Sequence, residues 1–177
     1  MTPKMYYVKK VGLGYLAVMA KPMCGAVVEE EFSGLAELGV MQVVSLLEIA
    51  EQDETGLANE KELCEKNNIK FISYPIQDHC LPASVTEFSQ VTKTIYNEIT
   101  EGINTVIHCR AGIGRTGMVA AGVLLHAAVE AVEAFQILSR ARGVQMPEIE
   151  QQYNWVVANQ TEIMGGESQN EKAPESA

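Results

Sequence analysis

The strongest constraint on the fold of this chain is a run in which a strand, a glycine-rich loop and a helix follow one another. Residues 104–107 form a short apolar run typical of a buried β-strand, and residues 117–125 are apolar over a helical length. The loop between them, residues 108–116, has the sequence His-Cys-Arg-Ala-Gly-Ile-Gly-Arg-Thr. A loop that leads into a helix N-terminus presents free backbone N–H groups to an anion. The run therefore predicts an α/β fold with an anion site at the strand end.

The same loop carries a thiol and a guanidinium six positions apart. A helix N-terminus and nearby cations favour the thiolate form of a cysteine, so Cys109 is predicted to be a nucleophile. Arg115 offers a planar fork that can hold two oxygens of a phosphate group. Glycines at 112 and 114 allow successive N–H groups to turn inward as an anion-binding nest. The predicted phosphate-binding residues are Arg110, Ala111, Gly112, Ile113, Gly114 and Arg115.

Two neighbouring side chains are predicted to support this site. The hydroxyl of Thr116 is placed to hydrogen-bond the sulfur of Cys109 and to help that sulfur leave a phosphoenzyme. His108 is placed to donate to backbone groups of the loop and to hold its shape.

Residues 112–117 also satisfy G-x-G-x-x-G, the pattern of dinucleotide-binding loops, so a dinucleotide-binding oxidoreductase is an alternative. That pattern expects a further strand ending in an acidic residue about 20 residues later. The chain instead continues through helical sequence past Glu130 and Glu133. The nucleophilic site is therefore the better interpretation.

The pattern His-Cys-x5-Arg-Thr resembles the signature of the cysteine-dependent protein tyrosine phosphatase superfamily, and the small size of the chain resembles its dual-specificity branch. Residues 43–48 and 72–78 are similar to the sheet strand and the general-acid loop of dual-specificity and cyclin-dependent kinase-associated phosphatases. The resemblance implies a protein tyrosine phosphatase-like fold. It also implies that a glutamine on a later helix positions the hydrolytic water. Gln151 falls at that place, although it and the adjacent Gln152 also fit ordinary helix surface.

An acid for this chemistry can be chosen from the residues alone, because the chain contains only two aspartates. Asp78 lies in a loop between Pro75 and Pro82 that follows a predicted strand at residues 70–73. Loops after parallel strands share one sheet edge, so Asp78 can face Cys109. We therefore predict that Asp78 is the general acid and, in the second step, the general base. The other aspartate, Asp53, lies in a hydrophilic run and is interpreted as surface.

These residues predict a phosphomonoester hydrolase that acts on phosphoproteins through a cysteinyl-phosphate intermediate. Phosphotyrosine is the first substrate expected, with phosphoserine and phosphothreonine in addition if the enzyme has dual specificity. Two alternatives remain: a phosphatase for phosphoinositides or other small phosphomonoesters, and a pseudophosphatase that binds phosphoproteins without turnover. We expect no cofactor and no metal, because the three histidines are scattered and form no ligand-spaced cluster.

Composition limits the partners and the compartment. The 177 residues are 47% hydrophobic, enough for one core, so we expect a single phosphatase domain over residues 1–164 and a disordered polar tail over residues 165–177. A net charge of −10 disfavours nucleic acids and anionic membranes as partners. The start of the chain lacks the apolar core of a signal peptide, so we expect a cytoplasmic monomer with reduced cysteines. A reversible disulfide between Cys80 and Cys109 is left open.

The remaining pattern alternates strands and helices, which predicts a mostly parallel central sheet covered by helices on both faces. The expected strands are 5–8, 15–19, 42–47, 70–73 and 105–108. The expected helices are 33–38, 60–67, 84–100, 116–128, 130–141 and 147–163.

Overall fold

Five strands form one sheet in the order β1-β2-β5-β3-β4. In the computed structural model, which describes residues 2–165, β1 and β2 form an antiparallel hairpin and the other neighbouring strands are parallel. The strand bounds are Tyr6–Val11 (β1), Gly14–Met19 (β2), Gln42–Ser45 (β3), Lys70–Ser73 (β4) and Thr105–His108 (β5). The central strand β5 leads into the glycine-rich loop. The predicted mostly parallel sheet is confirmed.

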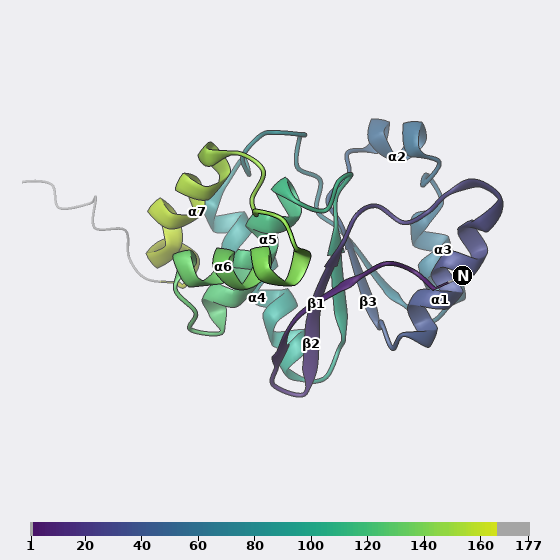
Figure 1. Cartoon of the computed structure of the whole chain (residues 1–177), viewed down its shortest axis with the longest axis horizontal. Coiled ribbons are helices and arrows are strands. Elements are labelled where there is room, and N and C mark those ends of the chain that lie inside the picture. The colour runs from purple at the N-terminus through teal and green to yellow at the C-terminus, as the bar shows by residue number, and fades with distance from the viewer. Residues whose placement is uncertain (1, 166–177) are drawn as a thin grey trace, which may run out of the picture.

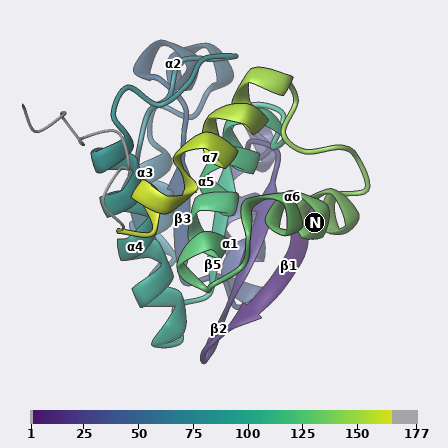
Figure 2. The ribbon, with the colours of Figure 1, turned by 90° about the vertical axis from the view of Figure 1, so that its left-hand side faces the viewer.

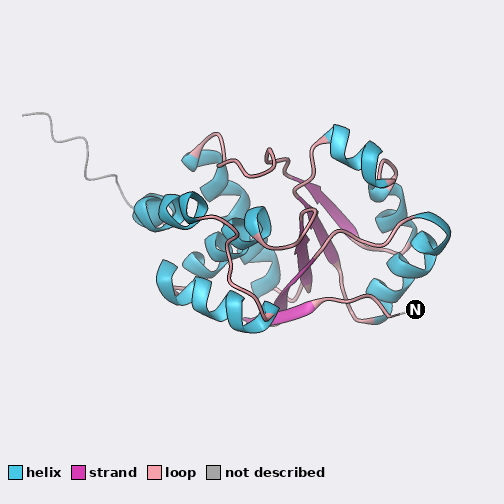
Figure 3. Ribbon diagram, turned by 45° about the horizontal axis from the view of Figure 1, so that its top comes forward, coloured by secondary structure: helices cyan, strands magenta, loops and turns pink. Residues whose placement is uncertain are grey.

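Helices cover both faces of this sheet (Figures 1 and 3). One face carries the short helices at the start of the chain, and the other carries four longer helices. The first group is η1 (Gly25–Val27), α1 (Val28–Glu37), α2 (Ile49–Thr55) and α3 (Glu60–Lys66). The second group is α4 (Val85–Thr100), α5 (Gly114–His126), α6 (Ala131–Arg142) and α7 (Glu150–Ile163). Each face has its own cluster of buried apolar side chains. The α/β fold class is therefore as predicted.

Helix α5 is the buried centre of the four-helix side, where it packs against β5, α4, α6 and α7 (Figure 2). Every residue from Gly114 to Leu125 is buried, which explains why this helix is apolar on all its sides. Contact with α4 is close: a Cβ on Gly122 would lie 2.7 Å from atoms of Phe88 and Thr92. This packing fixes the N-terminus of α5 at the end of β5.

The C-terminal ends of β2, β3, β4 and β5 lie together along one edge of the sheet. Ser45 of β3 pairs in register with His108 of β5 and with Ser73 of β4, while Met19 of β2 pairs with His108 from the other side. The segments that follow β3, β4 and β5 therefore leave the sheet side by side. This edge collects the residues of the candidate site.

Three differences between the structure and the predicted elements lie in the first third of the chain. Helix α1 begins at Val28, so Ser33 lies inside it and donates from its hydroxyl to the Glu30 carbonyl instead of capping the helix. Helix α2 was not predicted, because its residues were interpreted as a hydrophilic surface run. Strand β3 ends at Ser45, two residues earlier than expected, and Leu46 and Leu47 lead on toward α2.

The structure does not support the alternative of a dinucleotide-binding fold. Between residues 2 and 165, α5 is followed by α6 and α7 and by no further strand, so the dinucleotide-binding pattern lacks its second strand. None of the helices described is both long and apolar enough to cross a membrane. The predicted disordered tail lies outside the described residues from position 166 onward, and the single domain over residues 1–164 stays a prediction.

Candidate active site

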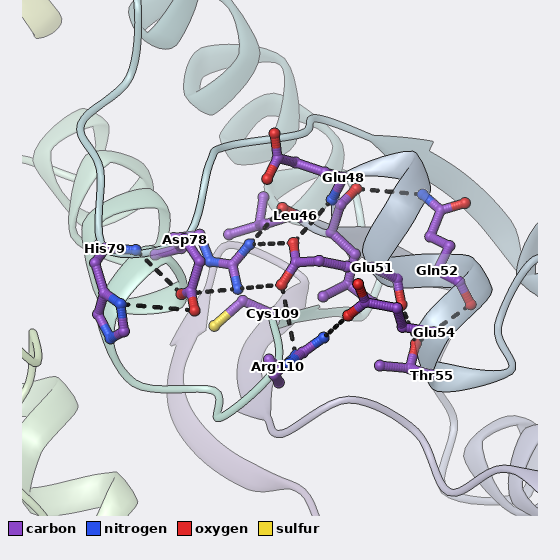
Figure 4. A network of polar contacts seen from close by, with 12 residues as sticks. Leu46, Glu48, Glu51, Gln52, Glu54, Thr55, Asp78, His79, Cys109 and Arg110 are labelled. Atoms are coloured by element: carbon purple, nitrogen blue, oxygen red, sulfur yellow. Dashed lines mark hydrogen bonds and ion pairs between the residues drawn. The ribbon is translucent and has the colours of Figure 1, made fainter.

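The candidate site lies where the segments after β3, β4 and β5 meet (Figure 4). Glu51 comes from α2 after β3, Asp78 from the segment after β4, and Cys109 from the end of β5. Arg115 lies in the first turn of α5. The sheet thus brings together the predicted nucleophile, guanidinium and acid, and it adds a carboxylate that was not predicted.

The loop after Cys109 turns its carbonyl groups toward donors outside it. The carbonyl of Arg110 accepts from the Lys21 N–H at 3.1 Å, and the carbonyl of Ala111 accepts from Nη2 of Arg142 at 3.2 Å. The carbonyl of Cys109 lies 3.2 Å from Nδ1 of His108. In a trans peptide the following N–H points the opposite way. The N–H groups of residues 110–112 are left without an acceptor in residues 2–165 and can form an anion nest.

The two loop glycines are required for different reasons. Gly112 has φ +69°, and a Cβ there would lie 2.1 Å from the carbonyl oxygen of Met19, so only glycine fits. Gly114 begins α5 and has no such backbone angle, but a Cβ there would lie 2.8 Å from Oε1 of Gln152. The predicted nest role therefore suits Gly112, whereas Gly114 makes room for a side chain of α7.

Arg115 is 1% exposed and is held from several sides. Its Nη1 donates to Oε2 of Glu51 at 2.6 Å and its Nη2 donates to Oε1 at 3.0 Å, which is a bidentate pair. Nη1 also donates to the Ile76 carbonyl at 2.9 Å. The Nε atom is buried without a partner in residues 2–165, and Nη2 lies 3.0 Å from Oδ1 of Asp78. The Nε and Nη2 edge is therefore the edge that a ligand can bind, in competition with Asp78 for Nη2.

The charges of this cluster stabilise one another. Burial by itself lowers the pKa of Arg115, but the hydrogen bond to Glu51 and the charges of Cys109, Glu51 and Asp78 raise it overall. The hydrogen bond from Arg115 lowers the pKa of Glu51, against the opposing effect of burial. The contribution of Glu51 to stability is therefore complete above the ordinary glutamate pKa and is lost as the pH falls through the lower folded value. At neutral pH both groups are charged.

Asp78 faces this cluster from the segment after β4, as the sequence predicted. Its side chain is 44% exposed, and Oδ1 accepts from the backbone N–H of His79 at 3.1 Å as well as meeting Arg115. The imidazole of His79 lies between two carboxylates, 3.7 Å from Asp78 and 3.6 Å from Glu148. Asp78 thus has a cation beside it and is accessible to solvent.

Of the two residues predicted to support the site, His108 lies where it was expected and Thr116 does not. His108 is fully buried and meets the Cys109 carbonyl, as expected. The predicted bond from Thr116 to the Cys109 sulfur is wrong, because the buried Thr116 hydroxyl has no hydrogen-bond partner within residues 2–165. The physical reason is that α5 begins at Gly114, two residues earlier than predicted, so Thr116 lies inside the first turn and faces the core.

The glutamine of α7 that meets the loop is Gln152 and not Gln151. Gln151 is exposed, whereas Gln152 is 1% exposed and packs against Gly114. The amide oxygen and nitrogen of Gln152 have no partner in the described part of the chain. A signal for this was present, because Val156 and Ile163 mark the buried face of α7 and Gln152 shares their helical spacing.

The side chain of Arg110 is also placed differently from the prediction. Its Nη2 donates to Glu54 at 2.8 Å and its Nε lies 3.6 Å from Glu51, so its charge is turned toward α2 (Figure 4). Arg110 can therefore offer the loop its backbone N–H but not a free guanidinium. Ile113, three residues further along the loop, is the apolar N-cap residue of α5.

The residues that sequence reasoning missed are two carboxylates, Glu51 and Glu60. Glu51 was dismissed within a hydrophilic run, although its spacing from Glu48 is that of a helix start, and the Glu48 N–H donates to Oε2 of Glu51 at 3.0 Å. Glu60 is the first residue of the helix predicted at residues 60–67 and was given no role, but it is 1% exposed and meets His108. All four cysteines are free thiols, and no group of three metal-ligating side chains occurs among the described residues.

Glu51→Gln is expected to lower kcat/KM for p-nitrophenyl phosphate by about 10²-fold, because a displaced guanidinium is costly to a reaction that depends on orientation. The amide has one acceptor oxygen in place of two, so the bidentate hold on Arg115 is lost. The matched control is Glu54→Gln in the same helix, which removes an exposed partner of Arg110 and should change kcat/KM little. Equal kcat/KM values for the two variants would contradict a positioning role for Glu51.

Comparison with known proteins agrees with this geometry. The family model described as "Polymorphic toxin system, DSP-PTPase phosphatase" matches residues 17–128. The 197R protein of Invertebrate iridescent virus 6, which is named as a tyrosine phosphatase, is 30% identical over 125 residues. That match covers 67% of this chain and 44% of the viral protein, so the chain spans less than half the length of this relative.

Solved structures share the fold. Kinase-associated phosphatase (KAP), in a form whose catalytic cysteine is replaced by serine, matches with a TM-score of 0.83 and 18% identity, over 95% of this chain and 99% of that one. Tk-PTP in its active form matches with a TM-score of 0.73 and 25% identity, over 93% and 99% of the two chains. The matching family segment contains the strands, the loop and the helix that form the site described above. The chain therefore belongs to the dual-specificity-type protein tyrosine phosphatase family.

Proposed function

We propose that this phosphatase hydrolyses phosphoproteins, phosphotyrosine in the first place, through a cysteinyl-phosphate intermediate. The observation that carries the proposal is the open donor set around Cys109: three consecutive loop N–H groups and the Nε of Arg115 have no acceptor in the described chain. Donors held in place before the ligand arrives suit the oxygens of a phosphoryl group in the transition state.

In the first step, the Cys109 sulfur attacks phosphorus and the bond from phosphorus to the leaving oxygen breaks. Arg115 and the loop N–H groups hold the three remaining oxygens, and Asp78 gives its proton to the leaving oxygen. In the second step, a water attacks phosphorus, Asp78 takes the proton, and the bond between sulfur and phosphorus breaks. We assign Gln152, in place of Gln151, to hold this water, because its unpartnered amide lies against Gly114.

The contact between Asp78 and Arg115 places the proposed acid at the ligand edge of the guanidinium. Without a ligand, Oδ1 of Asp78 lies 3.0 Å from Nη2 of Arg115. A phosphoryl group bound to the Nε and Nη2 edge replaces Asp78 as the partner of Nη2 and leaves its carboxyl group beside the leaving oxygen. Asp78 exchanges protons with solvent, because 44% of its side chain is exposed.

Charge around the loop supports a protein substrate over a polyphosphorylated one. Arg110 is paired with Glu51 and Glu54, and position 113 is isoleucine, so among the described loop residues 108–116 Arg115 is the guanidinium with an unpartnered Nε for a ligand. The whole chain has a net charge of −10. PTPMT1, solved in complex with PI(5)P, shares the fold at 14% identity, which keeps a phosphoinositide or another small phosphomonoester as the second candidate.

The test combines trapping of the intermediate with a substrate panel. After a rapid quench with a phosphotyrosine peptide, mass spectrometry should find one phosphoryl group on the peptide that contains Cys109. Steady-state kcat/KM should be at least about tenfold higher for phosphotyrosine peptides than for PI(5)P in micelles. The reverse order would favour the second candidate. Binding of the phosphopeptide with neither label nor turnover would identify a pseudophosphatase.

A further inference from the structure

Helix α6 contacts the phosphate-binding loop through its last residue, to which the proposed reaction gives no role. That residue is Arg142, and Gly143, with φ +79°, ends the helix directly after it. Nη2 of Arg142 donates to the carbonyl of Ala111 at 3.2 Å. Donor and acceptor are 31 positions apart in the sequence. The loop is therefore held in part from outside the strand and the helix that it connects.

The guanidinium of Arg142 lies over an aromatic ring of β1. Its Cζ is 4.3 Å from the centroid of the Tyr6 ring, which is the distance of a cation–π contact. Tyr6 begins β1 and pairs in register with Val18 of β2, and α6 packs against β1 (Figure 2). Nε of Arg142 is buried without a hydrogen-bond partner in residues 2–165. Within that range, the Tyr6 ring and the Ala111 carbonyl therefore determine where the guanidinium lies.

The direction of the Ala111 carbonyl determines the direction of the N–H that follows it. The two groups of a trans peptide point opposite ways, so a carbonyl turned out toward Arg142 turns the N–H of Gly112 into the loop. This N–H is the last of the three loop N–H groups that lack an acceptor in residues 2–165. Arg142 therefore orients a donor that the proposed reaction assigns to a phosphoryl oxygen.

The two preceding carbonyls are held in a different way. The carbonyl of Arg110 accepts from the backbone N–H of Lys21, which no change of the lysine side chain removes. The carbonyl of Cys109 is met by the ring of the residue directly before it. The carbonyl of Ala111 depends on one side chain from a distant helix. Loss of that side chain should therefore disturb the N–H that follows Ala111 and leave the two earlier N–H groups oriented.

We propose that Arg142, stacked on Tyr6, is a positioning residue that directs the Gly112 N–H at the bound phosphoryl group. The proposal rests on the proposed function, in which the loop N–H groups hold the phosphoryl oxygens. Arg142 acts through the Ala111 peptide and not on the reacting atoms. An arginine suits this task, because a planar guanidinium can stack on a ring and donate in its own plane, whereas a lysine ammonium is a point charge.

A first test removes the guanidinium. In Arg142→Ala, the Kd of inorganic phosphate measured by isothermal titration should rise by about tenfold, which is the effect of one hydrogen bond to a charged group. The matched control is Arg140→Ala, which removes the same charge from an exposed position of the same helix. Salt screens an exposed charge, so this variant should keep the wild-type Kd. Equal Kd values for folded Arg142→Ala and the wild type would overturn the proposal.

A second test separates the position of the guanidinium from its charge. Tyr6→Leu keeps every charge and removes the ring beneath Arg142, so the Kd of phosphate should rise by about threefold. The conservative variant Tyr6→Phe keeps the ring and should restore the affinity. The double variant of Tyr6→Leu and Arg142→Ala should bind phosphate as weakly as Arg142→Ala alone, because Tyr6 acts through Arg142. A wild-type Kd in Tyr6→Leu, or additive effects in the double variant, would contradict the role of the stacked pair.

The amide resonances report the direction of the donors themselves. In ¹H–¹⁵N spectra of the wild type, phosphate should move the amide protons of residues 110–112 downfield, because each then donates to an anion. In Arg142→Ala, the shift of Gly112 should be lost, and the shifts of residues 110 and 111 should remain. A purely structural role would change all three or none. If Arg142→Ala does not fold, the same spectra of Tyr6→Leu decide.

These measurements need phosphate binding but no turnover. A wild-type protein that shows the three shifts and hydrolyses no phosphoester would contradict the proposed function and leave this inference standing. An active wild type with the same Gly112 shift in folded Arg142→Ala would overturn this inference alone.

Discussion

Cys109→Ser is expected to reduce hydrolysis of p-nitrophenyl phosphate to the rate measured without enzyme. A serine hydroxyl nearly matches the thiol in size, but it stays protonated at neutral pH and has no general base to activate it. The nearest carboxylate assigned to proton transfer, Asp78, is engaged with Arg115 in the ligand-free structure. No other step of the proposed reaction can proceed without the bond from sulfur to phosphorus.

Loss of activity must be separated from loss of folding. Cys109→Ser keeps the loop N–H groups and Arg115, so isothermal titration should show that it still binds inorganic phosphate. Cys24→Ser is the matched control. Cys24 is a free thiol that packs on the face of the sheet covered by α1 and α3, and its Sγ donates a hydrogen bond to the Pro22 carbonyl at 3.2 Å. It should keep full activity, and a chelator should have no effect on the wild type. Substantial turnover by Cys109→Ser would contradict the mechanism.

Three carboxylates surround this site, and their environments give them different tasks. Glu51 is bound by both terminal nitrogens of Arg115, and its pKa is lowered, so it stays charged and holds the guanidinium. Glu60 is buried with His108, away from solvent. Asp78 is 44% exposed and shares the ligand edge of Arg115. Of these three, Asp78 alone combines solvent access with a place at the guanidinium edge proposed to hold the phosphoryl group.

The parts of the site that a local pattern encodes were predictable. The strand, loop and helix around Cys109 follow from apolar periodicity and glycine spacing within a single run. Asp78 was found because the chain has only two aspartates and because loops after parallel strands share an edge. Asp53, the other aspartate, is exposed on α2 as predicted, although that helix was not predicted.

The parts that depend on distant partners were not predictable. Glu51 and Arg115 are 64 positions apart, and Glu60 and His108 are 48 apart, so no local pattern distinguishes these glutamates from surface ones. Thr116 was misplaced because the start of α5 was expected two residues late, and a shift of that size rotates a side chain to another helix face. Gln151 was chosen over Gln152 from resemblance, when the helical spacing of α7 favoured the latter.

Asp78→Asn is expected to lower kcat by on the order of 10²–10⁴ for a phosphotyrosine peptide, because the leaving phenolate then departs without a proton. The amide has nearly the same shape and can still contact Nη2 of Arg115, so the site should keep its structure. For p-nitrophenyl phosphate, whose leaving group is stable as an anion, the loss should be much smaller. The ratio of the two losses measures protonation of the leaving group directly.

Steady-state kinetics over a range of pH completes this measurement. The limb of the kcat/KM profile at which activity is lost as the acid deprotonates should vanish in Asp78→Asn, because asparagine does not titrate. Asp53→Asn, which changes the other aspartate of the chain on the exposed side of α2, is the matched control and should keep both limbs. Equal losses for the two substrates would show that Asp78 acts on the position of Arg115 and not on the leaving group. The exposed carboxylate beside the guanidinium would then join Glu51 as a positioning residue, and another group would have to supply the proton.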